Sequence, residues 1–382
     1  MEWSFELSLT VFLVVAFVSQ LISFLSRGRL SLPLAFGLIF MAGFSLEIFP
    51  KDFIDKTGLL GVGRIAFNVL IIHAGTMFSL RELKRNRKAL LITLSGVILS
   101  NVIIIGGLSG LIGRELAILA APSVVGGGAT CAIASVSVMR SLPEISFFPW
   151  LIFMLQCLFG APVFALMLKK EKLKIGGYRK EMASLPEARG RIADKMNGSL
   201  KGTAFYLMAL MLLSLLNRLF FNTFFSGTGL SLNLTALLIG IVVGETGLID
   251  RNPLQKADCF GLLMLGLMSL MAKSLANIPL SAVIALIPPA LICFAVSTTA
   301  LVLSGIALSR PLGVSRTRAV VIAISSLVPV PVNIIMIKSI IKPESAFETD
   351  DVARLIEETK MGSLYVINIF SVLLISIAVS FI

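Results

Sequence analysis

The stretch of sequence that decides the fold is residues 120–135, AAPSVVGGGATCAIAS, where three consecutive glycines interrupt an otherwise apolar helical run. Glycine weakens a helix, so we expect the chain to unwind here and leave backbone amides and carbonyls without intrahelical partners. In hydrocarbon such groups are costly, so the unwound turn is expected to be packed in protein or to line a polar cavity. The alternative is that these small residues only allow neighbouring helices to approach closely.

The rest of the chain is strongly apolar. Of its 382 residues, 57% are hydrophobic and 14% are charged, and the mean hydropathy is +0.96. Apolar runs of about 20 residues recur from end to end, which predicts an all-α polytopic membrane protein rather than a β-barrel. Basic loops explain the net charge of +12 better than nucleic-acid binding does.

The sequence contains no pattern typical of an enzyme. It has a single histidine, no paired carboxylates at helical spacing within a span and no glycine-rich phosphate loop, so we expect neither catalysis nor an ATP-driven pump. The four cysteines lie in apolar segments, so no disulfide and no metal cluster is expected. They are Cys131, Cys157, Cys259 and Cys293.

The apolar segments fall into two halves of the same order and spacing, 1–168 and 202–382. A basic linker, 169–201, joins them and is expected to be cytoplasmic. Each half holds five predicted spans and one interrupted segment, at about 114–140 and 316–342, and the last span is predicted to begin at Gly362. If each interrupted segment is a re-entrant hairpin, the odd number of crossings makes the two halves inverted repeats.

Charge supports this topology. With ten spans, two hairpins entering from opposite faces and both termini outside, most of the 33 Lys and Arg fall in predicted inner connections. The outer connections hold only Lys51, Lys56, Arg114 and Arg140. We therefore expect a multi-pass protein of a bacterial inner membrane.

The second interruption reads SSLVPVPVN over residues 325–333 and is broken by prolines instead of glycines. Each proline lacks an amide donor and frees a carbonyl about one turn back, which can coordinate a cation. Corresponding Gly- or Pro-interrupted segments are the best sequence indication of a transporter's binding site. The predicted substrate- and ion-binding residues are Ser123, Gly126, Gly127, Gly128, Thr130, Ser325, Ser326, Pro329, Pro331 and Asn333.

Three segments resemble the sodium/glutamate symporter family. Residues 73–84, HAGTMFSLRELK, are similar to the exit of its third span, and 268–280, MSLMAKSLANIPL, to a pattern in its second half. GGGAT at 126–130 stands where the family has Gly-Gly-His-Gly-Thr, so Gly128 replaces a histidine and Ala129 a glycine. The second hairpin also departs from the family's Gly-Ala-Thr-Pro-Thr-Ala pattern. The resemblance implies sodium-coupled, elevator-like transport of an anion by a homodimer.

Polar groups within predicted spans are further candidates, because they are costly at membrane depth. Arg64 or Lys273 could attract an anion, although Arg64 could instead extend to the outer interface. His73 could change charge near neutral pH or simply pack in the core. The remaining secondary candidates are Asn68, Thr76 and Glu245, and the neutral Asn101, Gln156 and Asn368 could join a site or only link helices.

These observations predict a secondary active transporter that couples sodium to the symport of glutamate or a similar small organic anion. One alternative is a cation/proton antiporter or amino-acid exporter of the same architecture, with Glu245 or His73 titrating. A passive channel or a membrane sensor subunit is an alternative of another class. The expected partners are membrane lipids, the anionic solute and a second copy of the chain, with no nucleic acid. We expect no cofactor, with sodium as the coupling ion.

Overall fold

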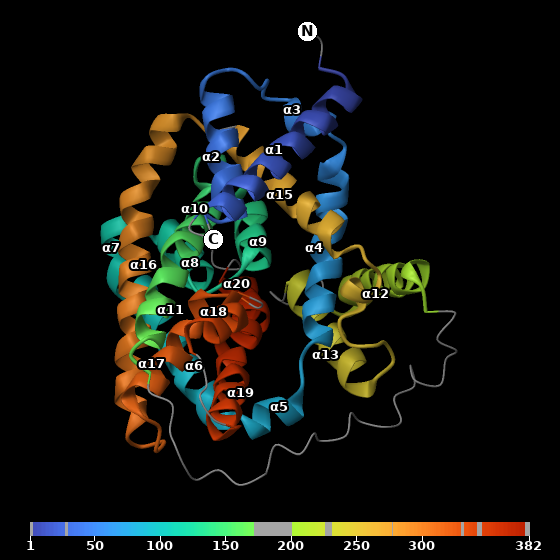
Figure 1. The fold of residues 1–382 in the computed structure, drawn as a ribbon. Helices are drawn as coiled ribbons and strands as arrows, with labels where there is room; N and C mark the ends of the chain where they lie inside the picture. Colours follow the sequence, from blue (N-terminus) through green and yellow to red (C-terminus); the bar gives the residue numbers. More distant parts are fainter. Residues whose placement is uncertain are drawn as a thin grey trace.

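The structure is a computed structural model that describes residues 3–26, 30–171, 201–225, 231–276, 278–329, 332–341 and 346–378. These residues form helices and connecting turns, with no β-strand among them (Figure 1). The first half contains α1 (Phe5–Leu25), α2 (Leu32–Ser45), α3 (Phe53–Lys56), α4 (Leu59–Thr76), α5 (Leu80–Arg85), α6 (Arg87–Val102), η1 (Ile103–Leu108), α7 (Ser109–Ile112), α8 (Arg114–Ser123), α9 (Gly128–Val138), η2 (Pro143–Ile145), α10 (Phe148–Leu155), η3 (Gln156–Gly160) and α11 (Ala161–Leu168).

The second half contains α12 (Thr203–Phe224), α13 (Leu232–Thr246), α14 (Pro253–Lys256), α15 (Phe260–Ala276), α16 (Leu280–Ser309), α17 (Arg316–Ile324), η6 (Ser325–Leu327), α18 (Val332–Ile340), α19 (Ala346–Lys360), η7 (Met361–Phe370) and α20 (Ser371–Ala378). Of the short η elements, η1, η3 and η7 are π-helical, and η2 and η6 are 3-10 turns.

Seven helical segments of the described chain are long and apolar enough to cross a membrane, which makes this a multi-pass membrane protein. They are Phe5–Leu25, Leu59–Thr76, Arg87–Ile112, Pro143–Leu168, Thr203–Phe224, Leu280–Ser309 and Asp350–Ala378. Three further expected spans are the shorter helices α2, α13 and α15, of 14, 15 and 17 residues.

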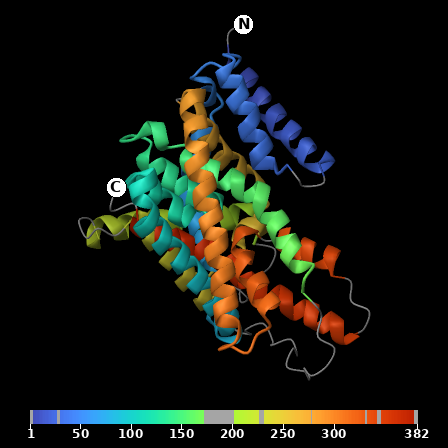
Figure 2. The ribbon, with the colours of Figure 1, turned by 90° about the vertical axis from the view of Figure 1, so that its left-hand side faces the viewer.

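The helices pack in two groups. In one, α4 lies along α13 and α15, while α2 contacts α1 and α15; Figure 2 shows α1 and α2 side by side at one end of the molecule. In the other, α16 lies along α6 and α17 and contacts α10. Glycines permit the closest crossings: a Cβ atom at Gly75 of α4 would lie 2.6 Å from the Leu237 carbonyl oxygen of α13.

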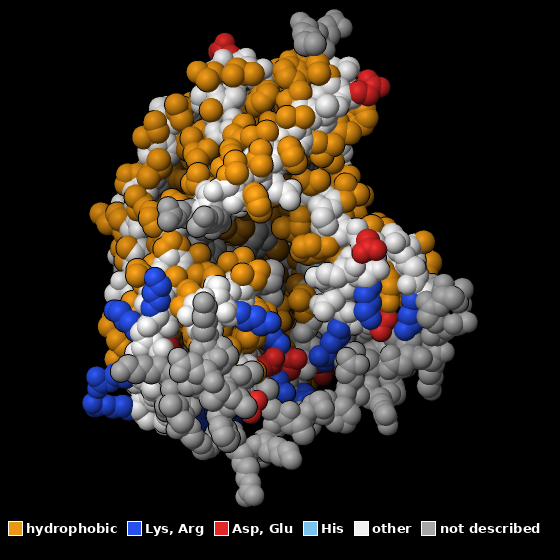
Figure 3. Space-filling model, in the orientation of Figure 1, with side chains coloured by type: hydrophobic (Ala, Val, Ile, Leu, Met, Phe, Trp, Pro, Cys, Tyr) orange, Lys and Arg blue, Asp and Glu red, His pale blue; other side chains and the backbone are white. Residues whose placement is uncertain are grey.

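Lys and Arg side chains gather at one end of the face drawn in Figure 3. In Figure 3, hydrophobic side chains cover the upper part of the face, and Lys and Arg gather below, where Figure 1 shows α5, α6, α17 and α19.

A buried carboxylate lies at the contact between α12 and α14. Asp250 accepts a hydrogen bond from Tyr206 (2.7 Å) and pairs with Lys201 (3.2 Å) and Lys256 (3.4 Å). Burial alone would raise the pKa of Asp250, but these partners outweigh it and hold the pKa below its ordinary value.

The last helical segment begins earlier than the sequence predicts. Helix continues from Ala346 through η7 to Ala378, whereas the predicted last span begins at Gly362. The added helix, α19, is rich in acidic residues, which is why the sequence did not predict it as part of the last span. Its carboxylates instead meet cations of α17 and α5, as described below, so tertiary contacts stabilise this charged helix.

Candidate functional site

The first interrupted segment consists of α8 and α9, which are separated by residues 124–127. Helix α8 ends at Ser123, three positions before Gly126, and Gly128 already begins α9. Ser123 and Val125 are fully buried, and the Ser123 hydroxyl donates to the Leu119 carbonyl at 2.6 Å. A Cβ atom at Gly126 would lie 2.6 Å from the Thr130 Cβ atom, so this tight turn requires glycine. The break at the glycine run thus lies in packed protein.

The second interrupted segment consists of α17, η6 and α18. After Ile324 the chain tightens into the 3-10 turn Ser325–Leu327, whose residues are buried. The Ser325 hydroxyl donates to the carbonyl oxygens of Ile322 (2.7 Å) and Thr359 (3.0 Å), and the Ser326 hydroxyl donates to that of Ala323 (2.9 Å). Pro329 follows and is half-buried, whereas Pro331 lies outside the described residues.

Each break contacts the last helix of the other half of the chain. The first break contacts the region of η7, and the second break contacts η3. At the first break, the Ser371 hydroxyl donates to the Val125 carbonyl at 3.2 Å, next to η7. A Cβ atom at Gly127 would lie 2.8 Å from the Cγ2 atom of Ile367 in η7. At the second break, the Gln156 side-chain amide of η3 donates to the Ser326 carbonyl at 3.3 Å. The space-filling view is hollowed near its centre, in the region where Figure 1 shows α9 and α20 (Figure 3).

Segment η7 also contacts the second break. A Cβ atom at Gly362 would lie 2.6 Å from the backbone nitrogen of Ser326. The Asn333 side-chain amide donates to the Ser363 hydroxyl at 2.8 Å and to the Thr359 hydroxyl at 3.4 Å, and all three residues are fully buried. The last helix therefore holds both breaks through small and hydroxyl-bearing residues.

Two buried oxygen atoms at the breaks have no hydrogen-bond partner within the described chain. They are the Oγ1 atom of Thr130 on α9 and the Oε1 atom of Gln156 on η3. Leaving such an atom unpaired costs about 1–3 kcal/mol. The N-terminus of α9, at Gly127, likewise has no side-chain cap. A cation would satisfy the oxygens, and an anion would satisfy the helix N-terminus.

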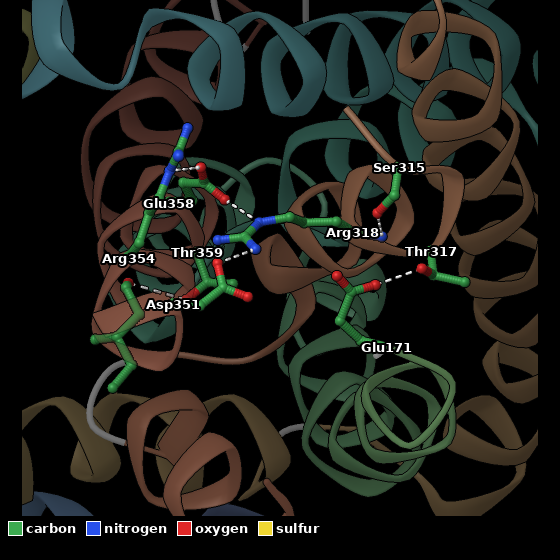
Figure 4. Close-up of polar contacts among 9 residues, drawn as sticks. Glu171, Ser315, Thr317, Arg318, Asp351, Arg354, Glu358 and Thr359 are labelled. Carbon is green, nitrogen blue, oxygen red and sulfur yellow. Dashed lines mark hydrogen bonds and ion pairs between the residues drawn. The ribbon is translucent and has the colours of Figure 1, made fainter. Parts of the chain in front are cut away.

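A partly buried ion-pair cluster joins the second interrupted segment to α19 (Figure 4). The Arg318 guanidinium of α17 donates to Asp351 (2.6 Å) and Glu358 (2.7 Å), and Glu358 also accepts from Arg354 (3.0 Å). The Ser315 hydroxyl caps α17 by accepting from the Arg318 amide at 3.3 Å. Arg318 is only 6% exposed, so removal of either partner would leave a buried charge unpaired, and the two ion pairs link α17 to α19.

Within the described structure, the hydrogen bonds and ion pairs of the secondary candidates do not join them to the two breaks, although the helices α4 and α15 contact α9. Arg64 is exposed, and Asn68 is half-buried. His73 is buried; its Nδ1 atom accepts from the Leu254 amide at 3.5 Å, and its backbone carbonyl accepts from the Thr76 hydroxyl at 2.7 Å.

The two charged secondary candidates are engaged in ion pairs. Lys273 pairs with Asp55 at 2.5 Å. Glu245 pairs with Arg251 at 3.2 Å and accepts from the Leu80 amide at 3.3 Å. In neither case do the described contacts involve a residue of the two breaks.

Several residues at the breaks were not predicted from the sequence. Thr359 and Ser363 are one helical turn apart and therefore lie on the same face of the last helix. The sequence did not reveal this pairing, because the last span was predicted to begin only at Gly362. Ser371 lies in an apolar segment and Arg318 in a basic one. Neither local sequence indicates which distant residue the side chain contacts. Among the described residues, no group of three or more His, Cys, Asp or Glu is placed to hold a metal ion.

No protein-family model matches the chain, and no curated protein matches it.

Proposed function

We propose that the protein is a secondary active transporter built from two inverted repeats of five spans, each with a re-entrant hairpin. The order of helices supports this: α2, α3 and α4 in the first half match α13, α14 and α15 in the second, including a four-residue helix before the third span of each. The last helix of each half also contains a π-helical segment, η3 or η7.

The observation that carries the proposal is that each break contacts the last helix of the other half, with unpaired buried oxygens beside it. Irregular backbone at membrane depth is tolerated only where protein or a polar cavity surrounds it, and paired breaks of this kind are typical of transporter binding sites. We propose that Thr130, Gln156 and carbonyls at the breaks bind sodium, and that the N-terminus of α9 binds the anionic group of glutamate or a similar solute.

Uptake of radiolabelled glutamate into proteoliposomes tests this function. We expect accumulation with an inward sodium gradient and none when potassium replaces sodium. Gly127→Leu should abolish uptake without preventing membrane insertion, because the side chain would enter the space of Ile367. Gly261→Leu is the matched control, since a Cβ atom at Gly261 of α15 meets no atom within 4 Å. Unchanged uptake by the Gly127 variant would refute the site assignment.

A further inference from the structure

The short helix α5 joins the two groups of helices, because it connects α4 to α6. Its sequence starts with the capping-box pattern Ser79-Leu80-Arg81-Glu82, and the Ser79 hydroxyl accepts from the Glu82 amide at 3.4 Å. Glu245 at the end of α13 accepts from the Leu80 amide at 3.3 Å. The N-terminus of α5 is thus held by the group that contains α4 and α13.

Two side chains of α5 contact the last helix. The Tyr365 hydroxyl of η7 donates to the Glu82 carboxylate at 2.7 Å, and Arg85 pairs with Glu357 of α19 at 2.7 Å. Tyr365 is fully buried, and its ring contacts Phe78 edge-on at 6.0 Å. In a capping box the glutamate returns to its own helix; here Glu82 instead bonds the tyrosine, which is a hydrogen bond to a carboxylate and therefore a strong one.

The same segment, η7, contacts both breaks. Tyr365 lies three residues after Gly362, which contacts the Ser326 amide, and two residues before Ile367, which faces Gly127. Ser363 accepts from Asn333 at 2.8 Å. A shift of η7 along its axis would therefore change the packing at both breaks and the Tyr365–Glu82 bond together.

We propose that Tyr365 is a positioning residue that couples the two breaks to α5. When solute or ion binding displaces η7, the hydrogen bond to Glu82 breaks or re-forms, and α5 moves as the connection between the two groups of helices. The inference rests on the proposed transport function. It assigns to Tyr365 and Glu82 a role in the conformational step and not in contact with the solute.

Hydrogen–deuterium exchange of the full chain in lipid nanodiscs tests this coupling without a known solute. Tyr365→Phe keeps the ring and removes only the hydroxyl. We expect at least about tenfold faster amide exchange in α5 and at both breaks, because a hydrogen bond to a charged group is lost. Tyr206→Phe is the matched control: Tyr206 is buried and donates to Asp250 at the same 2.7 Å, but contacts neither α5 nor a break in the described structure.

Two more variants separate coupling from simple packing. Glu82→Gln keeps an oxygen that can accept from Tyr365 and should show a smaller effect, whereas Glu82→Leu should reproduce Tyr365→Phe. Faster exchange confined to the turn around residue 365, with α5 and the breaks unchanged, would overturn the proposal. Glutamate uptake by the unmodified protein is measured separately, so a failure of the transport function remains distinguishable from a failure of the coupling.

Discussion

Replacement of Gly362 by alanine is expected to distort the second break. A Cβ atom there would lie 2.6 Å from the Ser326 nitrogen and 2.9 Å from the Ser325 carbonyl carbon. These are backbone atoms, so no side-chain rotation relieves the overlap, and overpacking of this kind costs about 1–3 kcal/mol. Alanine also favours helix over glycine by about 0.5–1 kcal/mol, which opposes the loss.

Gly261→Ala isolates the steric contribution. It gains the same helix preference, but its Cβ atom meets open space. The difference in unfolding free energy between the two variants should therefore equal the free-energy cost of the steric overlap at Gly362, about 1–3 kcal/mol. SDS-induced unfolding, followed by the fluorescence of the two tryptophans, measures it.

Transport provides the second measurement. Gly362→Ala should reduce sodium-dependent uptake, because it distorts the Ser325–Ser326 turn of the proposed site, while Gly261→Ala should leave uptake unchanged. Equal stability and equal uptake for the two variants would refute the inferred contact between η7 and the second break.

Three further outcomes are expected. Arg318→Met leaves two partly buried carboxylates of α19 short of a cation and should lower the unfolding free energy by about 3 kcal/mol; a neutral effect in SDS unfolding would contradict the cluster. Thr130→Val removes an unpaired buried hydroxyl, so stability should hold or rise by about 1 kcal/mol while sodium-dependent uptake falls; intact uptake would remove Thr130 from the site. Because the pKa of Asp250 is lowered in the fold, its stabilisation is complete above about pH 4 and lost as the pH falls further. Acid unfolding should therefore be less steep in Asp250→Asn, and identical pH profiles would contradict this.

The sequence predicts the two breaks closely, because glycine runs and prolines act on their own local backbone. The first helix ends at Ser123 and resumes at Gly128, within the predicted interrupted segment, and the second is interrupted after Ile324. The sequence does not predict which side chains meet these breaks. Ser371 and Val125 are 246 positions apart, and only packing of the last helix brings them together.

The membrane class, the positions of most helices and the places where helices break were determined by the sequence alone, since hydropathy and backbone preference are properties of short segments. Tertiary structure decided that α19 is a helix, that Arg318 pairs with it and that Glu82 bonds Tyr365. A charged segment is stable at this site only when cations from distant elements pair with its acids. That pairing depends on how the helices pack and not on the local sequence.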